Sequence, residues 1–154
     1  MNGSTQSPGS TQSPGSTQSP GSTQSPGPIS RWLPPLLWMG LIFFVSAQPS
    51  LPSAPGRWDL LLKKGMHVLA YAILTALYLR AWIGGGARGW AARALSAGLA
   101  MAYAVSDEYH QTFVPGRNGS PVDLLFDGIG VTAVILLHWW YRSLRPARDE
   151  SASE

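Results

Sequence analysis

The sequence contains no cysteine and few charged residues: Asp, Glu, Lys and Arg together make up 12% of it, about half the share in a typical soluble domain. The absence of cysteine excludes a disulfide framework, a thiolate zinc site and a cysteine nucleophile. Eleven Lys and Arg stand against eight Asp and Glu, which is too few for the dense basic surface of a nucleic-acid-binding protein. We therefore expect no nucleic-acid partner.

The N-terminal region almost completely lacks hydrophobic residues and has no charged ones. Residues 4–27 are four identical copies of Ser-Thr-Gln-Ser-Pro-Gly. No position in this unit can bury apolar area, and each copy carries a Pro and a Gly that interrupt helices and strands. The region also lacks the charged start and apolar core of a signal peptide. We predict a disordered, low-complexity tail over residues 1–28.

Four apolar segments follow the tail, over about residues 29–48, 66–83, 90–111 and 122–141. Each has about the length that spans a bilayer core. The third is rich in Ala and Gly, which allow close helix packing within a membrane. The fourth has no charge over residues 129–141 and no polar stripe, which argues against a soluble four-helix bundle. The pattern predicts an all-α integral membrane protein, with four transmembrane helices in a compact bundle over residues 29–142.

Aromatic and basic residues indicate how these helices are oriented. Trp32, Trp58, Trp90 and the run Trp139-Trp140-Tyr141 lie at predicted helix ends, where an interfacial aromatic belt belongs. Four spans place both termini on one side, and the positive-inside rule assigns that side to the cytoplasm. The basic residues then expected inside are Arg31, Arg80, Arg88, Arg93, Arg142, Arg145 and Arg148, and those expected outside are Arg57, Lys63, Lys64 and Arg117. Residues 143–154 become a short charged cytoplasmic tail.

Ionisable residues collect at the outer ends of the second, third and fourth segments. Spacings of three and four place these residues on shared helix faces. A turn-rich loop over residues 114–119 would hold an arginine above them. The residues that could converge there are Lys64, His67, Tyr71, Asp107, Glu108, His110, Gln111, Arg117, Asp123 and Asp127.

This polar set has both a functional and a structural interpretation. Ionisable groups within membrane helices are costly and often mark functional sites. Asp107 and Glu108 are adjacent carboxylates that repel each other unless a cation or a proton lies between them. Arg117 is the obvious cation, and a buried Arg–carboxylate pair can also be purely structural. Asp123 can equally cap its helix, and His67 can be a hydrogen-bonded packing residue.

Three motifs resemble the VanZ-like family. The string Asp107-Glu-Tyr-His-Gln-Thr-Phe-Val-Pro-Gly-Arg117, followed by Asp123, Asp127 and Gly130, is similar to the family signature. Lys64-Gly-Met-His67 with Tyr71 resembles the second-helix motif, and residues 44–49 resemble the ending of the first helix. The hexapeptide repeats are not part of the family pattern, and the position of Asp127 is often Asn in the family.

The resemblance implies a small integral membrane protein of the bacterial cytoplasmic membrane and cell envelope. The namesake of the family is associated with reduced susceptibility to teicoplanin, a glycopeptide antibiotic. No agreed molecular activity follows from the resemblance. The positions that carry over as a motif set are Lys64, His67, Tyr71, Asp107, Glu108, Gln111, Arg117, Asp123 and Asp127.

Two function hypotheses remain open, and we favour the first. In the first, the polar set binds a lipid-linked or peptidoglycan-related ligand, or docks a partner, with Arg117 and Lys64 holding phosphate or carboxylate. In the second, the protein is a membrane-embedded hydrolase or transferase acting on a lipid-linked substrate. Its catalytic candidates are His67 or Glu108 as general base and Arg117 as stabiliser of negative charge.

The enzyme hypothesis also gives the aspartates a role, since Asp107, Asp123 and Asp127 could orient groups or bind a divalent metal. No motif identifies a nucleophile, so we leave the enzyme assignment open. His67 is more readily a hydrogen-bonded packing residue than a metal ligand, so we assign no metal site, and we expect no cofactor. Transport is a third possibility, but the sequence has no inverted repeat to favour it.

Overall fold

The computed structural model describes residues 27–49, 57–117 and 119–144. These residues form four helices and no strand: α1 (Pro28–Ser46), α2 (Arg57–Gly84), α3 (Gly89–Gln111) and α4 (Pro121–Ser143). The all-helical prediction is therefore confirmed. Most of the predicted tail, residues 1–26, lies outside the described residues, and so does most of the predicted C-terminal tail, residues 145–154.

The ends of the helices follow from local sequence. Pro28 and Pro121 occupy the first turn of α1 and α4, where the missing N–H has no intrahelical partner to lose. The Ser120 hydroxyl caps α4 by accepting a hydrogen bond from the Val122 N–H at 3.2 Å. After α2, Gly86 turns the chain with a φ of 98°, a conformation that glycine adopts without steric cost.

The sequence located α1, α3 and α4 to within two residues but placed the start of α2 at residue 66, which was wrong. Helix α2 begins at Arg57 and continues through Lys63, Lys64 and Gly65. The apolar stretch marks the part of a helix that can lie in hydrocarbon, whereas the helix itself continues into the polar interface. Lysines favour helix formation and can extend their ammonium groups into water, so they do not end α2.

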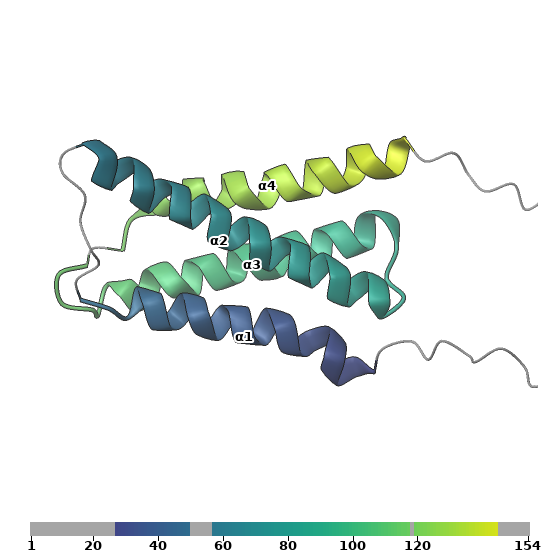
Figure 1. Ribbon diagram of the computed structural model, residues 1–154, viewed down its shortest axis with the longest axis horizontal. Coiled ribbons are helices and arrows are strands. Elements are labelled where there is room, and N and C mark those ends of the chain that lie inside the picture. The colour runs from purple at the N-terminus through teal and green to yellow at the C-terminus, as the bar shows by residue number, and fades with distance from the viewer. Residues whose placement is uncertain (1–26, 50–56, 118, 145–154) are drawn as a thin grey trace, which may run out of the picture.

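The four helices run antiparallel along the long axis of the molecule, and the described chain starts and finishes at the same end (Figure 1). Helix α2 contacts each of the other three helices, and α3 does the same. Within the described ranges, α1 and α4 make no contact with each other. We call the end formed by Ser46, Lys64, Gln111 and Pro121 the polar end, and the opposite end, around Trp32 and Trp82, the aromatic end.

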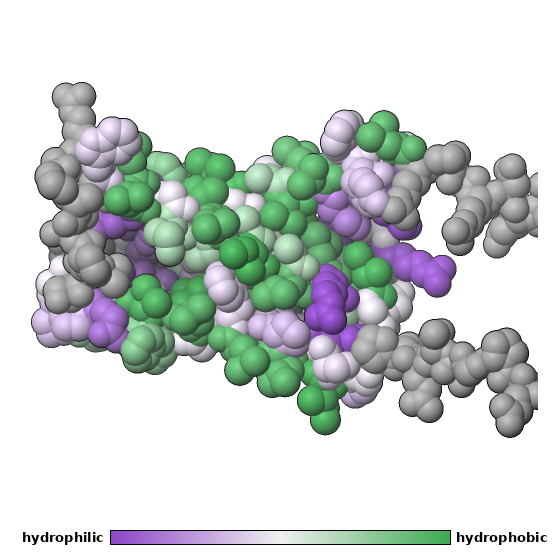
Figure 2. Space-filling model, in the orientation of Figure 1, coloured by the Kyte–Doolittle hydropathy of each residue, from purple (hydrophilic) through white to green (hydrophobic). Residues whose placement is uncertain are grey.

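Three of the helices are long and apolar enough to cross a membrane: Pro28–Ser46, Leu61–Gly84 and Pro121–Ser143. Large hydrophobic side chains such as Phe44, Leu125 and Leu137 are more than half exposed. Figure 2 shows hydrophobic side chains over the middle of the molecule and hydrophilic ones towards its two ends. This distribution fits a bilayer and not water, so the protein is described below as a membrane protein.

Helix α3 is not among the helices that are long and apolar enough to cross a membrane. The predicted four spans are therefore not established. Helix α3 carries Arg93, Asp107 and Glu108, and it has many Ala, Gly and Ser residues in place of large aliphatic ones. The small residues have a packing role: Ala92, Ser96, Ala100 and Ala104 are buried at every fourth position. Such a stripe lets neighbouring helices approach closely. Glu108 is the next residue at this four-residue spacing and is also buried.

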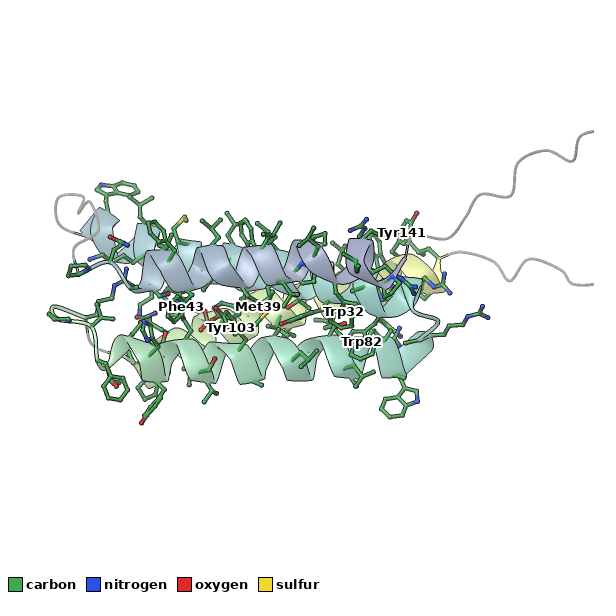
Figure 3. All side chains as sticks on the ribbon, turned by 90° about the horizontal axis from the view of Figure 1, so that it is seen from below. Trp32, Met39, Phe43, Trp82, Tyr103 and Tyr141 are labelled. Carbon is green, nitrogen blue, oxygen red and sulfur yellow. The ribbon has the colours of Figure 1, made fainter. Side chains whose placement is uncertain are left out.

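Interhelical hydrogen bonds hold α1 against α2 and α3. The Tyr103 hydroxyl donates to the Met39 carbonyl at 2.7 Å, and the Trp38 indole N–H donates to the Ala70 carbonyl at 2.9 Å. Figure 3 shows Met39 and Tyr103 between α1 and α3, with Trp32 and Trp82 nearer the aromatic end. There the two indole rings meet edge to face, with centroids 5.0 Å apart.

Candidate functional site

The centre of the polar end is a contact between three helices. His67 of α2 places its Nδ1 atom 2.9 Å from Asp127 Oδ1 of α4 and 4.0 Å from Glu108 Oε1 of α3. Asp127 is completely buried, Glu108 is 6% exposed, and the His67 side chain is 17% exposed. We call these three residues the His67–Glu108–Asp127 cluster. The sequence placed all three in its candidate set, and the structure brings them together.

A glycine in α4 makes the His67–Asp127 contact possible. A Cβ atom on Gly130 would collide with the backbone carbonyl oxygen of Val68 and lie 3.1 Å from the backbone nitrogen of Ala72. The backbones of α2 and α4 therefore cross in direct contact at Gly130. His67 precedes Val68, and Asp127 lies one turn before Gly130, so this crossing sets the distance between the two side chains.

The loop before α4 anchors Glu108. Its Oε2 atom accepts a hydrogen bond from the Ser120 backbone N–H at 2.7 Å. A Cβ atom on Gly119 would collide with the Glu108 carbonyl oxygen, so a glycine is required for the loop to reach α3 this closely. One carboxylate oxygen of Glu108 is thus fixed by the loop, and the other, Oε1, is directed at His67.

Asp107 belongs to a neighbouring hydrogen-bond group that faces α1. Its Oδ2 atom accepts hydrogen bonds from the Ser46 hydroxyl at 2.9 Å and from the Gln111 amide at 3.0 Å. All three residues are buried. Ser46 was not among the predicted site residues, although it lies within the segment 44–49 that resembles the family's first-helix ending. That motif is the signal that could have identified it.

Lys64 and Asp123 form an ion pair at the edge of the cluster. The two side chains connect α2 to α4 and are 18% and 15% exposed. The Lys64 ammonium also lies 5.3 Å from the centroid of the Phe126 ring, which is within cation–π range. Ser120, and not Asp123, takes the N-cap position of α4, whereas Asp123 lies in the first turn, near the positive end of the helix dipole.

Arg117 does not pair with the carboxylates, which corrects the expectation from sequence. Its Nε atom donates to the Gln48 carbonyl at 3.1 Å and its terminal nitrogen donates to the Val45 carbonyl at 3.0 Å. The last carbonyls of a helix have no intrahelical donor and carry the negative end of the helix dipole. Arg117 places its positive charge at this end of α1, and Gly116, at a φ of 81°, makes the turn that aims it there.

Two other predicted residues differ in position. The His110 ring stacks on Phe43 of α1, with centroids 4.4 Å apart, and makes no described contact with the cluster. Tyr71 is 1% exposed, lies one turn of α2 from His67, and is within electrostatic range of Asp107, Glu108 and Asp127. The structure therefore places Tyr71 within electrostatic range of the cluster, whereas His110 packs against α1.

The sequence model of the VanZ/LLP1 family matches residues 31–142. The chain belongs to the VanZ/LLP1 family. The matched range contains the residues of all four helices that meet at the polar end. The match confirms the resemblance that the three motifs indicated. No curated protein and no solved structure matches the chain.

The VanZ/LLP1 residues at the polar end can do chemistry of two kinds. The partly exposed Lys64, His67 and Asp123 offer both charges to a ligand arriving from outside the bundle. The buried carboxylates of Glu108 and Asp127 offer oxygen atoms beside an imidazole, which suits proton transfer or cation binding. In the part of the chain that the structure describes, no Lys or Arg forms an ion pair with Glu108 or Asp127.

Proposed function

We propose that the chain is a four-span protein of the bacterial cytoplasmic membrane, with both termini in the cytoplasm and the polar end outside. The antiparallel arrangement of four helices and the apolar surface of three of them support this topology. The small-residue face of α3 supports a fourth span that is surrounded by its neighbours more than by lipid. More of the basic residues lie towards the aromatic end, as the positive-inside rule requires of the cytoplasmic side.

We propose further that the polar end binds a lipid-linked or peptidoglycan-related ligand, or a partner, of the cell envelope and thereby modulates susceptibility to teicoplanin. The observation that carries this proposal is the convergence of polar side chains from three helices in the His67–Glu108–Asp127 cluster, beneath partly exposed groups. Membrane helices do not need such a cluster in order to pack, and ionisable groups at this depth mark function by default.

The ligand first contacts the Lys64–Asp123 pair. Because both side chains retain some exposure, an incoming phosphate or carboxylate can compete for the ammonium, and an incoming amine can compete for the carboxylate. Arg117 acts differently from the expectation, because two of its nitrogen atoms donate to carbonyls at the end of α1. Its contribution is to fix the loop that holds Glu108.

The test is teicoplanin susceptibility in a sensitive bacterial host that expresses the wild type, His67→Ala, Glu108→Gln or Arg117→Ala. Membrane abundance of each protein is matched by immunoblot. The control is His138→Ala, which removes an imidazole from the aromatic end. We expect the wild type and His138→Ala to raise tolerance and the three polar-end variants to lose it.

A wild-type protein that leaves susceptibility unchanged would contradict the role in teicoplanin tolerance. Loss of tolerance in His138→Ala at equal abundance would contradict the assignment to the polar end, because it would show that any histidine in the bundle matters.

The runner-up is a membrane-embedded hydrolase or transferase, and one observation favours it. His67 Nδ1 lies 2.9 Å from Asp127 Oδ1, a contact in which a buried carboxylate orients an imidazole for proton transfer. Glu108→Gln tests the base that this hypothesis requires, since glutamine keeps the shape and the hydrogen bond from Ser120 but cannot act as a base. Full tolerance in this variant would exclude Glu108 as a general base.

A further inference from the structure

The His67–Glu108–Asp127 cluster has the geometry of a cation site. One ligand atom from each residue can be chosen so that all three lie within 4.8 Å of one another. The three side chains come from three different helices, so the backbone fixes their positions. Ligand sites on helices are more rigid than sites on loops.

Several oxygen atoms in this region lack a hydrogen-bond partner. Glu108 Oε1 and Asp127 Oδ2 are buried without one, on side chains that are 6% and 0% exposed. The Tyr71 hydroxyl, outside the cluster but within electrostatic range of both carboxylates, is also buried and unpartnered. Buried polar groups are nearly always satisfied, because an unsatisfied one costs about 1–3 kcal/mol. Buried nitrogen atoms of Trp82, His110 and His138 also lack a partner, but among the described residues only in the His67–Glu108–Asp127 cluster do two unpartnered carboxylates lie beside an imidazole that can share a ligand with them.

The charge balance indicates the sign of that ligand. Glu108 and Asp127 each carry a carboxylate, and His67 also lies within electrostatic range of the Asp107 carboxylate. Two cationic side chains of the polar end have other partners: Lys64 pairs with Asp123, and Arg117 donates to the carbonyls of Val45 and Gln48. Buried carboxylates that are not paired repel one another and are costly. A cation between them would offset both effects.

The mixture of ligand atoms indicates the kind of cation. Ca²⁺ and Mg²⁺ prefer sites made of oxygen alone, whereas Zn²⁺ is held by imidazole nitrogen together with carboxylate oxygen. A zinc site with three protein ligands leaves a fourth position open. We propose that His67, Glu108 and Asp127 bind one Zn²⁺ ion between α2, α3 and α4. This departs from the expectation of no metal site, which took His67 as a hydrogen-bonded packing residue and could not show contacts between three helices.

Direct binding measurements on the full chain test the proposal without reference to antibiotic susceptibility. The protein is purified in detergent through a tag without histidine, treated with EDTA and exchanged into metal-free buffer. Zn²⁺ is then titrated by calorimetry, and the bound metal is counted by elemental analysis. We expect one Zn²⁺ per chain in the wild type and binding at least about tenfold weaker in Glu108→Gln and Asp127→Asn.

Two control variants keep the test specific. His138→Ala removes the imidazole at the aromatic end, and His110→Ala removes the imidazole that stacks on Phe43. Both should bind Zn²⁺ as the wild type does. Mg²⁺ titrated in place of Zn²⁺ should bind at least about tenfold more weakly to the wild type.

Three results would overturn the proposal: a wild type that binds no Zn²⁺, a control variant that loses as much affinity as Glu108→Gln, or tighter binding of Mg²⁺ than of Zn²⁺. Because the substitutions by Gln and Asn preserve side-chain shape, their elution on size exclusion should match the wild type. If either variant aggregates, His67→Gln provides the same comparison from α2, and the wild-type stoichiometry decides the proposal by itself.

Discussion

The two ends of the helix bundle each contain a partly buried histidine, but in opposite surroundings. At the polar end, His67 faces the carboxylates of Glu108 and Asp127. At the aromatic end, His138 lies within electrostatic range of Arg93 and Arg142, and the described side chains there offer it no carboxylate. The neighbouring contacts are between rings, including Trp32 with Tyr78 and Trp82.

The two ends differ in their contacts: those at the aromatic end hold the helices together, whereas the buried carboxylates at the polar end are not needed for packing. The described contacts of the aromatic end include ring packing and the hydrogen bond from Arg31 to the Gly84 carbonyl. This end needs no buried acid. The polar end contains three buried carboxylates, Asp107, Glu108 and Asp127, at a cost in desolvation. Since packing can be achieved without them, the acids at the polar end serve function in our account.

The largest expected effect is at the close crossing of α2 and α4. Gly130→Ala introduces a Cβ atom against the backbone of Val68 and Ala72, which no side-chain movement can relieve. We expect a loss of about 3 kcal/mol, the upper end of the range for overpacking, and separation of His67 from Asp127. Thermal unfolding in detergent, followed by tryptophan fluorescence, measures the loss.

Gly128→Ala is the matched control on the same helix. Its Cβ atom would meet only Met101 side-chain atoms at 3.9 Å, so this variant should unfold at the wild-type temperature or slightly above it, because alanine favours helices. Equal unfolding temperatures for Gly130→Ala and the wild type would contradict the crossing described here.

The next effect concerns the loop at the polar end. Arg117→Lys keeps the charge but loses the fork that reaches both Val45 and Gln48 carbonyls. We expect a loss of about 2 kcal/mol, as for a hydrogen bond that involves a charged group. The same substitution at the exposed Arg88 should change nothing. A stable Arg117→Lys protein would show that the loop is held by other contacts.

The smallest effect is expected at the aromatic end. Trp82→Leu removes the edge-to-face contact with Trp32 and should cost about 1 kcal/mol, as for other aromatic pairs. Susceptibility to teicoplanin should stay at the wild-type level at equal abundance. Trp90, which is 75% exposed, provides the control Trp90→Leu. Loss of tolerance in Trp82→Leu would contradict the claim that only the polar end acts in tolerance.

Most of the fold could be predicted from the sequence. Four apolar segments and the proline and glycine residues between them located three helices to within two residues, because those signals act over one or two turns. The start of α2 was wrong by nine residues, since the end of an apolar stretch is set by lipid and the end of a helix is set by the backbone. Whether α3 spans the membrane depends on its neighbours, which hydropathy does not describe.

For the candidate site, the sequence indicated which residues gather at one end of the bundle but not which of them contact one another. Helical spacing placed His67, Asp107 and Asp127 correctly at one end, but spacing within one helix cannot say which residue of another helix it meets. Charge alone favoured Arg117 as the partner of the carboxylates. In the structure, Arg117 instead donates hydrogen bonds to carbonyls at the end of α1, because Gly116 directs the loop there. Gly130 brings His67 to Asp127 because it lets the two helix backbones touch. The pattern of charges in the sequence could not predict this contact.

The most direct test of the central claim is the unfolding temperature of the double variant Glu108→Gln/Asp127→Asn, measured in EDTA beside the wild type. Both substitutions keep shape and hydrogen bonds but remove the negative charges. If the carboxylates serve function at the expense of stability, the double variant unfolds at the wild-type temperature or above it. An unfolding temperature several degrees below the wild type would show that the charges hold the bundle together, and it would contradict the account.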